Sequence, residues 1–418
     1  MLGTDPAIIE EVRARFAHVD SCPFTGERIF FENAGGALTL NSVVETSAKF
    51  AAIPDNQGRD NPASKELDRL ITKARDDAKV FFHASSGQVF VGESGTELLF
   101  RIISAAIMGS ATGGQVLGST LEHPASSSAC KVWAETAGKP YVGIIHDNDT
   151  GTVTAEHYRP HVTLDTRVAT IVHASPVTGM GTDIAAIAAA IREISPDCFI
   201  VVDGIQHAAH GHVDIDAAGI DAYVVSPYKM FSRHGYGLAW ISERLQQLPH
   251  DKIVGAAQER WELGTRDTGA YATFSDVVDY FVWLGGRVGG TGDRRGRIEA
   301  AASAIHAHEQ DLTNALIHGI GNYPGLKDMA AVSILCGTDN PLREGLVSFN
   351  VNGKSAPEVV SQLRERGIRV HARAADHYSG NVLKPLGLPS CVRISLCHYN
   401  TEAEVTAFLA AMREIVAV

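Results

Sequence analysis

Two clusters of polar residues follow apolar runs in the middle of the chain. Asp203 and Gln206 come after one run, Ser226 and Lys229 come after the next, and Lys229 stands 26 positions beyond Asp203. If both runs are strands of a parallel sheet, the clusters share its carboxyl edge, where open α/β sheets bind ligands. A lysine can form a Schiff base with an aldehyde, and a carboxylate can keep a pyridine nitrogen protonated, so the pair suits pyridoxal phosphate chemistry. Either residue alone would be interpreted as a cap or a solvated side chain.

Further residues offer binding chemistry. Gly95 and Thr96 precede a helical pattern, so their backbone N–H groups and the helix dipole form a site for an anion. His123 presents a flat ring on a loop, although a lone loop histidine is more often structural. Arg393 can grip a carboxylate in a bidentate fork or form a structural ion pair, and the residue by itself does not decide between the two.

Three histidines, His207, His210 and His212, stand within six residues and raise the alternative of a transition-metal site. No cysteine or second carboxylate cluster joins them in the sequence, so we expect no metal site. A nicotinamide cofactor is also disfavoured, because the sequence has no GxGxxG fingerprint between a strand and a helix.

Short apolar runs alternate with helical patterns between residues 88 and 241, which predicts a mostly parallel sheet covered by helices on both faces. The seven predicted strands are Gln88–Gly92, Gln115–Gly118, Tyr141–Ile145, Ala169–His173, Phe199–Val202, Ala222–Val225 and Leu238–Ile241. Helical patterns among them cover residues 97–108 and 184–194.

The two ends of the chain predict a different arrangement. Helices are expected over residues 5–19 and 67–82, and a long one from Gly296 toward Gly319. A strand at 346–351, a helix opened by a capping box at Ser355, a strand near 392–396 and a final helix from Thr401 follow. The sequence therefore predicts a large α/β domain over residues 60–295 and a smaller α+β domain built from residues 1–59 and 296–418.

The composition excludes several classes of protein. The chain has 418 residues, of which 45% are hydrophobic, and a formal net charge of −12, so it can bury a large core and offers no basic footprint for nucleic acid. No apolar stretch reaches the ~18 residues of a membrane helix, and the N-terminus has no pattern of a secretory signal. The six cysteines are scattered without CxxC, which is typical of reduced thiols. We expect a soluble cytoplasmic protein with no nucleic-acid or membrane partner.

Motifs along most of the chain resemble those of class V aminotransferases of fold type I, in particular the cysteine desulfurase group. The matching segments are Phe31-Glu-Asn-Ala-Gly-Gly36, Gly92-Glu-Ser-Gly-Thr-Glu97, Glu122-His123, Asp203-x-x-Gln206, Ser226-x-x-Lys229, Trp261-Glu-Leu-Gly-Thr265 and Arg393-Ile-Ser-Leu-Cys-His-Tyr-Asn-Thr401. The resemblance implies the fold type I architecture of pyridoxal-phosphate-dependent transferases: a mostly parallel seven-stranded sheet in a large α/β domain, plus a smaller α+β domain.

The resemblance also implies a role for individual residues. Lys229 would hold pyridoxal 5′-phosphate as an internal aldimine and then act as general base, and His123 would stack on the cofactor ring. The other implied cofactor-binding residues are Gly95, Thr96, Asp203, Gln206, Ser226, Tyr228 and Thr265. Thr265 would reach the cofactor phosphate of the partner subunit in a homodimer, and Tyr228 stands where many relatives have a histidine. The substrate-binding candidates are Asn33, Ala34, Gly35, Arg373 and Arg393.

The chain departs from the cysteine desulfurases at their nucleophilic cysteine. The corresponding loop here, Gly367–Ser379, contains no cysteine, and Asp376 falls at the ungapped position of the thiol. Cys391 and Cys397 lie on or beside the predicted strand of Arg393, where we expect small buried side chains. The loop could recognise a second substrate carboxylate, supply a general acid, or be a solvated surface. Its polar residues are His371, Arg373, Asp376, His377 and Tyr378.

We therefore predict an enzyme that acts at the α-carbon of a small amino acid, through a quinonoid and a desulfurase-like or C–S lyase-like β-elimination, without a cysteine persulfide relay. Class V transamination or epimerisation is the alternative among enzymes, and a regulatory protein that binds pyridoxal phosphate is the alternative outside them. The residues name neither the substrate nor a protein that accepts the product.

Overall fold

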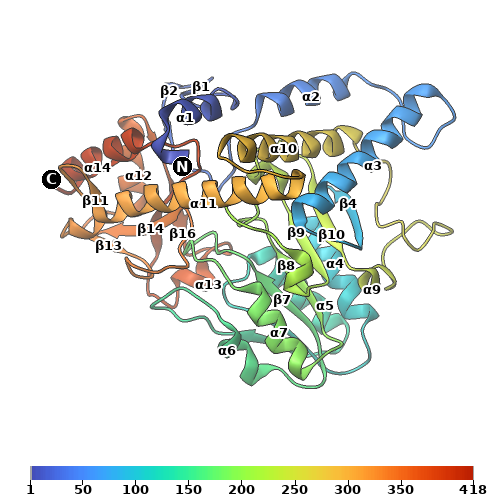
Figure 1. Ribbon diagram of the computed structural model, residues 1–418. Helices are drawn as coiled ribbons and strands as arrows, with labels where there is room; N and C mark the ends of the chain where they lie inside the picture. The colour runs from blue at the N-terminus through green and yellow to red at the C-terminus, as the bar shows by residue number, and fades with distance from the viewer. Residues whose placement is uncertain (1, 418) are drawn as a thin grey trace.

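The computed structural model describes residues 2–417 and is built around a seven-stranded sheet (Figure 1). The strand order is β4-β10-β9-β8-β7-β5-β6, and only β10 runs against its neighbours. The strands are β4 (Gln88–Gly92), β5 (Gln115–Ser119), β6 (Tyr141–Ile144), β7 (Thr166–Val172), β8 (Phe199–Asp203), β9 (Ala222–Val225) and β10 (Gly237–Ile241). The mostly parallel seven-stranded sheet predicted from the sequence is confirmed.

Alternate residues of the central strands enter two different hydrophobic clusters, as the pleat of a doubly covered sheet requires. Val201 and Val224 pack on the face covered by α4 and α5, whereas Val202 and Tyr223 belong to the opposite cluster. The covering helices are α4 (Gly95–Gly109) and α5 (Pro124–Thr136) on one face, and α3 (Pro62–Phe82), α7 (Ile184–Ile194), α10 (Thr268–Arg287) and α11 (Arg294–His318) on the other.

A second, antiparallel sheet lies near the C-terminal end of the chain, with the order β13-β14-β17-β16 (Figure 1). One of its faces buries Val347, Phe349 and Val392 against α12, α14 and the second half of α11. The opposite face carries polar residues of the site described below. The elements are β13 (Val332–Ile334), β14 (Leu346–Val351), β16 (His371–Ala374), β17 (Ser390–Ser395), α12 (Ala356–Glu365) and α14 (Glu402–Ala417).

The N-terminal helix is shorter than the sequence pattern predicts. Helix α1 covers Pro6–Arg13, and the prediction of helix as far as residue 19 is wrong. Beyond the helix, Phe16 pairs with Leu40 in an isolated bridge, and the N–H of Ala17 donates to the carbonyl of Thr39 at 2.9 Å. The apolar residues of α1 join the hydrophobic cluster of the large sheet, so the proposed division of the chain at residues 59 and 296 stays a prediction.

Short elements connect these layers. They are α2 (Asn41–Ala51), α6 (Ala155–Tyr158), α8 (Ile215–Ala218), α9 (Glu243–Gln246) and α13 (Gly380–Leu383), and the strand pairs β1 (Ser21–Cys22) with β2 (Gly26–Glu27), β3 (Ile29–Phe30) with β15 (Ile368–Arg369) and β11 (Gly319–Ile320) with β12 (Tyr323–Pro324). Within residues 2–417, no helix combines the length and apolar composition needed to cross a membrane.

Candidate active site

The carboxyl ends of the parallel strands bring the predicted cofactor residues to one edge of the large sheet. Asp203 is the last residue of β8, and Ser226 follows β9 directly. His123 follows β5, and Gly95 begins α4 after β4. A short 3₁₀ turn, Pro227–Lys229, then turns the lysine back over the strand ends. Residues that are distant in the sequence thus meet at the edge where open α/β sheets bind ligands.

Lys229 is partly buried, and its Nζ donates to Oε1 of Gln206 at 3.3 Å. Enclosure by the protein and the nearby charge of Arg393 lower the pKa of Lys229 to about 8, although Asp203 opposes this shift. A lysine with such a pKa supplies far more neutral amine near pH 7 than an ordinary lysine does, because its pKa is lowered from 10.5. Neutral amine is the nucleophilic form.

Two buried carboxyl groups lie at the bottom of the site. Asp203 is 3% exposed, and Oδ1 accepts from the N–H of Ile205 at 3.0 Å. Burial raises the pKa of Asp203 to about 6, and burial together with the charge of Asp203 raises the pKa of Glu122 to about 8. Glu122 accepts from the N–H of Val172 at 2.9 Å through Oε1, whereas its buried Oε2 has no partner in the described residues. A buried carboxylate in this position calls for a cationic partner.

The N-terminus of α4 and the hydroxyl of Ser226 form an anion cradle. Ser94 caps the helix by accepting from the N–H of Glu97 at 3.1 Å, which leaves the first N–H groups of the helix, including those of Gly95 and Thr96, without helical acceptors. A Cβ on Gly95 would collide with Oγ of Ser226, so glycine leaves the space at this point. The Ser226 hydroxyl makes no capping hydrogen bond to the turn that follows it, so it can donate to an anion.

Two rings border this edge. Burial lowers the pKa of His123 to about 4, so its imidazole is neutral near pH 7 and can stack on an aromatic ring. The ring of Tyr378 lies 6.2 Å from that of His123. Tyr228 stacks on His234 at 4.3 Å, and its carbonyl accepts from the N–H of Ala37 at 3.1 Å. Tyr228 thereby connects the lysine turn to the N-terminal loop.

Two arginines approach from the small sheet. Arg393 on β17 is 2% exposed; one terminal nitrogen donates to the carbonyl of Pro176 at 3.0 Å, and its buried Nε has no partner in the described residues. Arg373 on β16 donates through Nε to Oγ of Ser379 at 2.8 Å. Burial and the charge of Arg373 lower the pKa of Arg393 to about 10. The incompletely bonded guanidinium of Arg393 indicates an anionic ligand.

The predicted substrate loop packs against the end of β17. The side-chain amide of Asn33 donates to the carbonyl of Ser395 at 2.7 Å, and the hydroxyl of Tyr399 donates to Asn33 Oδ1 at 2.5 Å. Since these bonds occupy its side chain, Asn33 positions the loop. Ala34 lines a small cavity together with Gln206, and the N–H of Gly35 donates to the carbonyl of Glu32 at 2.9 Å. Direct substrate binding by Asn33, Ala34 and Gly35 stays a prediction.

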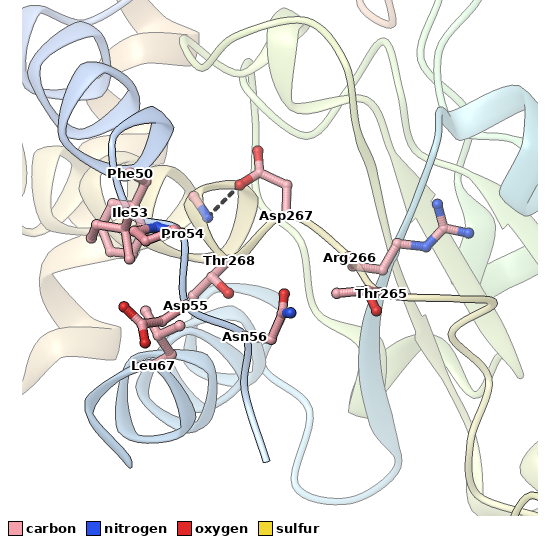
Figure 2. A pocket seen from close by; sticks show the side chains of 11 residues that line it. Phe50, Ile53, Pro54, Asp55, Asn56, Leu67, Thr265, Arg266, Asp267 and Thr268 are labelled. Atoms are coloured by element: carbon pink, nitrogen blue, oxygen red, sulfur yellow. Dashed lines mark hydrogen bonds between the residues drawn. The ribbon is translucent and has the colours of Figure 1, made fainter. Parts of the chain in front are cut away.

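Thr265 lies in a different pocket, of about 260 Å³. Figure 2 shows it beside Arg266 on the segment that leads into α10, facing residues of the α2–α3 connection such as Asn56. Thr265 is exposed. The fold of one chain therefore does not bring Thr265 to the lysine site.

The three clustered histidines diverge to separate partners. Nδ1 of His207 bonds Glu344 at 2.5 Å, Nδ1 of His210 bonds Glu309 at 2.8 Å, and Nε2 of His212 bonds the Ser303 hydroxyl at 2.8 Å. Among the described residues, the three histidines do not together form a group that could hold a metal ion. Among the described residues, His210 instead shares a buried cluster with Glu309 and Cys397, whose ligand atoms lie within 4.8 Å of one another.

Sequence reasoning overlooked two residues of the site. Glu122 was identified only as the neighbour of His123. Its position between an apolar strand and a helix could have predicted a buried carboxyl group at the sheet edge. Asn381 on α13 donates to the backbone carbonyls of Thr120 and Glu122 at 2.7 and 3.2 Å. Nothing in its sequence context indicates a contact across about 260 residues.

Known proteins are similar to this chain over nearly its whole length. The family model described as Aminotransferase class-V matches residues 29–282 and 296–408. The Aminotransferase-like protein FGM3 of Gibberella zeae is 26% identical over 97% of this chain and 98% of that protein, and the Cysteine desulfurase-like protein ustD of Aspergillus flavus is 26% identical over 98% and 90%. The apo cysteine desulfurase of Thermococcus onnurineus NA1 superimposes with a TM-score of 0.82, and the Escherichia coli cysteine desulfurase CsdA with 0.79; each is 20% identical, with 98% of both chains covered. This chain shares the fold of these two cysteine desulfurases.

Proposed function

The chain belongs to the aminotransferase class-V family, and from this premise we propose that it is a pyridoxal-phosphate-dependent enzyme acting at the α-carbon of a small amino acid. Members of the family use pyridoxal phosphate. The observation that carries the proposal is the partly buried Lys229 at the same sheet edge as the buried carboxyl of Asp203 and the anion cradle at Gly95 and Ser226.

These residues fit the parts of the cofactor. The cradle suits its phosphate, Asp203 suits the protonated ring nitrogen, and the neutral ring of His123 suits the ring face. When bound, pyridoxal phosphate supplies an aldehyde that condenses with amines and a ring that draws electrons from the substrate α-carbon. Two polar groups support the fit: Glu122 Oε2, which has no hydrogen-bond partner among the described residues, and the Ser226 hydroxyl, which faces Gly95.

The protein itself positions the substrate and moves its proton. Arg393 would bind the α-carboxylate through the guanidinium nitrogens that the fold leaves without acceptors. The neutral Nζ of Lys229 would take the proton from the α-carbon, and its lowered pKa supports that role. Gln206 orients Nζ by accepting its hydrogen bond.

For the outcome of the reaction, we favour a desulfurase-like or C–S lyase-like β-elimination without a cysteine relay. Cys391 and Cys397 are fully buried, and burial raises the pKa of both thiols, which disfavours a thiolate nucleophile. The alternative of transamination draws support from the relative named Aminotransferase-like protein FGM3.

A homodimer belongs to the same proposal. Thr265 is exposed and lies apart from Lys229 in its own chain, so a second copy would be needed to bring it to a cofactor phosphate. Sedimentation of the purified protein tests this. A stable monomer that binds the cofactor fully would contradict it.

The cofactor assignment is tested by replacing Lys229. Lys229→Ala should lose borohydride-dependent fixation of pyridoxal phosphate to the protein, and turnover should fall by several orders of magnitude. Lys131→Ala, which removes an exposed lysine, is the control and should retain both. Full turnover and covalent fixation in Lys229→Ala would show that another residue holds the cofactor.

A further inference from the structure

The side chains of Arg373 and Arg393 project from the same face of the small antiparallel sheet. In the antiparallel register, Arg373 of β16 stands opposite Cys391 of β17, and Arg393 stands two positions beyond Cys391. Such diagonal neighbours lie about 7–8 Å apart at the backbone, within reach of one ligand held by two long side chains. The alternate residues Val392 and Ile394 enter the small-domain core, so both guanidiniums lie on the side of Lys229.

Neither guanidinium forms an ion pair with a carboxylate of residues 2–417. Arg393 has one protein acceptor, the carbonyl of Pro176, and Arg373 has the neutral hydroxyl of Ser379. By contrast, two other arginines, Arg192 and Arg244, both form ion pairs with the buried carboxylate of Asp221. Two adjacent cations without a counter-ion destabilise each other, and desolvation adds to that cost.

The nearest carboxylates are engaged elsewhere. Glu32 pairs with Arg369 at 2.6 Å and with His371 at 3.2 Å. Asp376 uses Oδ1 to accept from the N–H groups of Tyr378 and Ser379 at 2.8 and 3.3 Å, in a turn that shapes the loop. Both acids attract the arginines only at longer range, so the positive charge of the pair is left for a ligand.

Arg373 is held in place before any ligand arrives. Its Nε and one terminal nitrogen share the Ser379 hydroxyl, and Asn381 fastens the following helix to the carbonyls at residues 120 and 122. Tyr378, between these two contacts, lies beside His123. A fixed guanidinium binds a planar anion with little further loss of side-chain entropy.

We propose that the substrate is an α-amino acid with a second anionic group near its α-carbon, a carboxylate or a sulfinate, and that Arg373 binds this second group while Arg393 binds the α-carboxylate. This inference rests on the proposed function: a sulfinate would suit the favoured cleavage of a C–S bond, whereas a carboxylate would suit the alternative of transamination. A substrate with one carboxylate would compensate one arginine and leave the other unmatched. A dianionic substrate compensates both, so the geometry favours aspartate-like over alanine-like amino acids.

The test compares matched amino acids on the holoenzyme. L-aspartate and L-cysteine sulfinate, titrated against the visible spectrum of the bound cofactor, should bind at least roughly tenfold more tightly than L-asparagine and L-cysteine. Arg373→Gln should weaken the two dianions roughly 10- to 100-fold and the neutral amino acids less than about threefold. Arg373→Lys should recover only part of the loss, because lysine lacks the planar fork.

Calorimetry on protein without cofactor gives a second readout. Succinate, which is aspartate without its amine, should bind wild-type protein more tightly than butyrate, and Arg373→Gln should remove the difference. Arg366→Gln is the charge-matched control, because Arg366 is an exposed arginine at the end of α12 that donates to Glu414, and it should leave both affinities unchanged.

Equal affinity for aspartate and asparagine in the wild-type holoenzyme, with no effect of Arg373→Gln, would overturn the inference and leave the proposed function intact. Failure of the purified protein to bind pyridoxal phosphate would instead contradict the proposed function. If Arg373→Gln does not fold, the wild-type comparisons of aspartate with asparagine and of succinate with butyrate still decide the matter.

Discussion

The side-chain amide of Asn381 donates to the backbone carbonyl of Thr120 at 2.7 Å, across the boundary between the small and the large sheet. Thr120 directly follows β5, and Asn381 lies on α13, just after the loop that carries Tyr378. This contact fixes the cysteine-free loop, Gly367–Ser379, over the edge that carries His123. The loop therefore borders the candidate active site on the side of His123.

Asn381→Ala should increase the mobility of this loop. Losing two hydrogen bonds to backbone carbonyls should lower turnover roughly tenfold while the cofactor remains bound. Amide hydrogen exchange should rise over residues 376–383. Asn340→Ala is the control, since Asn340 makes a comparable bond to the carbonyl of Thr150 and lies outside the site described here. Unchanged exchange and turnover in Asn381→Ala would mean that other contacts hold the loop.

Gly95→Ala should weaken cofactor binding. The added Cβ would collide with the Ser226 hydroxyl and with Ile205, and overpacking of this kind costs about 1–3 kcal/mol, or roughly 10- to 100-fold in affinity. Equilibrium dialysis of pyridoxal phosphate measures the loss. Gly286→Ala is the matched control, because Gly286 is also helical and has open space around it; it should leave binding unchanged and add about 0.5–1 kcal/mol of stability. Wild-type affinity in Gly95→Ala would argue against a phosphate at this helix end.

The large sheet was predictable because its signals are local. Each strand is a short apolar run, and the parallel arrangement follows from the helices between the runs, so Asp203 and Lys229 could be placed at one edge from the sequence alone. The end of α1 was not predictable from the local pattern, because the backbone pairing of Phe16 with the distant Leu40 replaces the helical conformation there. The Asn381 contact depends on packing between distant segments, which no local pattern records. The same holds for Arg373 and Arg393, which have no carboxylate partner within residues 2–417.

The buried carboxyl of Glu122 should contribute a loss of apoprotein stability as the pH rises from about 5 to 8. The pKa of Glu122 is raised from 4.5 to about 8 in the folded protein, so the folded state holds a proton that the unfolded state has released across this range. Each such proton gives a slope of up to about 1.4 kcal/mol per pH unit, and Asp203, with a pKa raised to about 6, adds to it in the lower part of the range.

Glu122→Gln should therefore make the pH dependence shallower and raise the free energy of unfolding most at pH 8. Chemical denaturation of the apoprotein at several pH values measures both effects. Glu135→Gln, which changes an exposed glutamate of α5, serves as the control and should follow the wild-type curve. Parallel curves for wild-type protein and Glu122→Gln would mean that Glu122 titrates normally.

Cys391→Ala should keep most of the turnover of the true substrate, and this outcome separates a cysteine-independent reaction from a persulfide relay. Cys391 is the informative thiol because it lies on the same sheet face as Arg373 and Arg393, yet it is fully buried on β17, and burial raises its pKa. We expect less than about threefold loss of turnover and about 1–2 kcal/mol of lost stability from the small cavity.

The measurement that decides is mass spectrometry of wild-type protein treated with L-cysteine. Cys22 serves as an internal control for thiol reactivity, since hydrogen bonds from Thr25 and Phe24 lower its pKa to about 7 and it is only half-buried. A stoichiometric persulfide at Cys391 that disappears together with turnover in Cys391→Ala would restore the relay; its absence would leave Lys229 and the two arginines as the groups around which the reaction is organised.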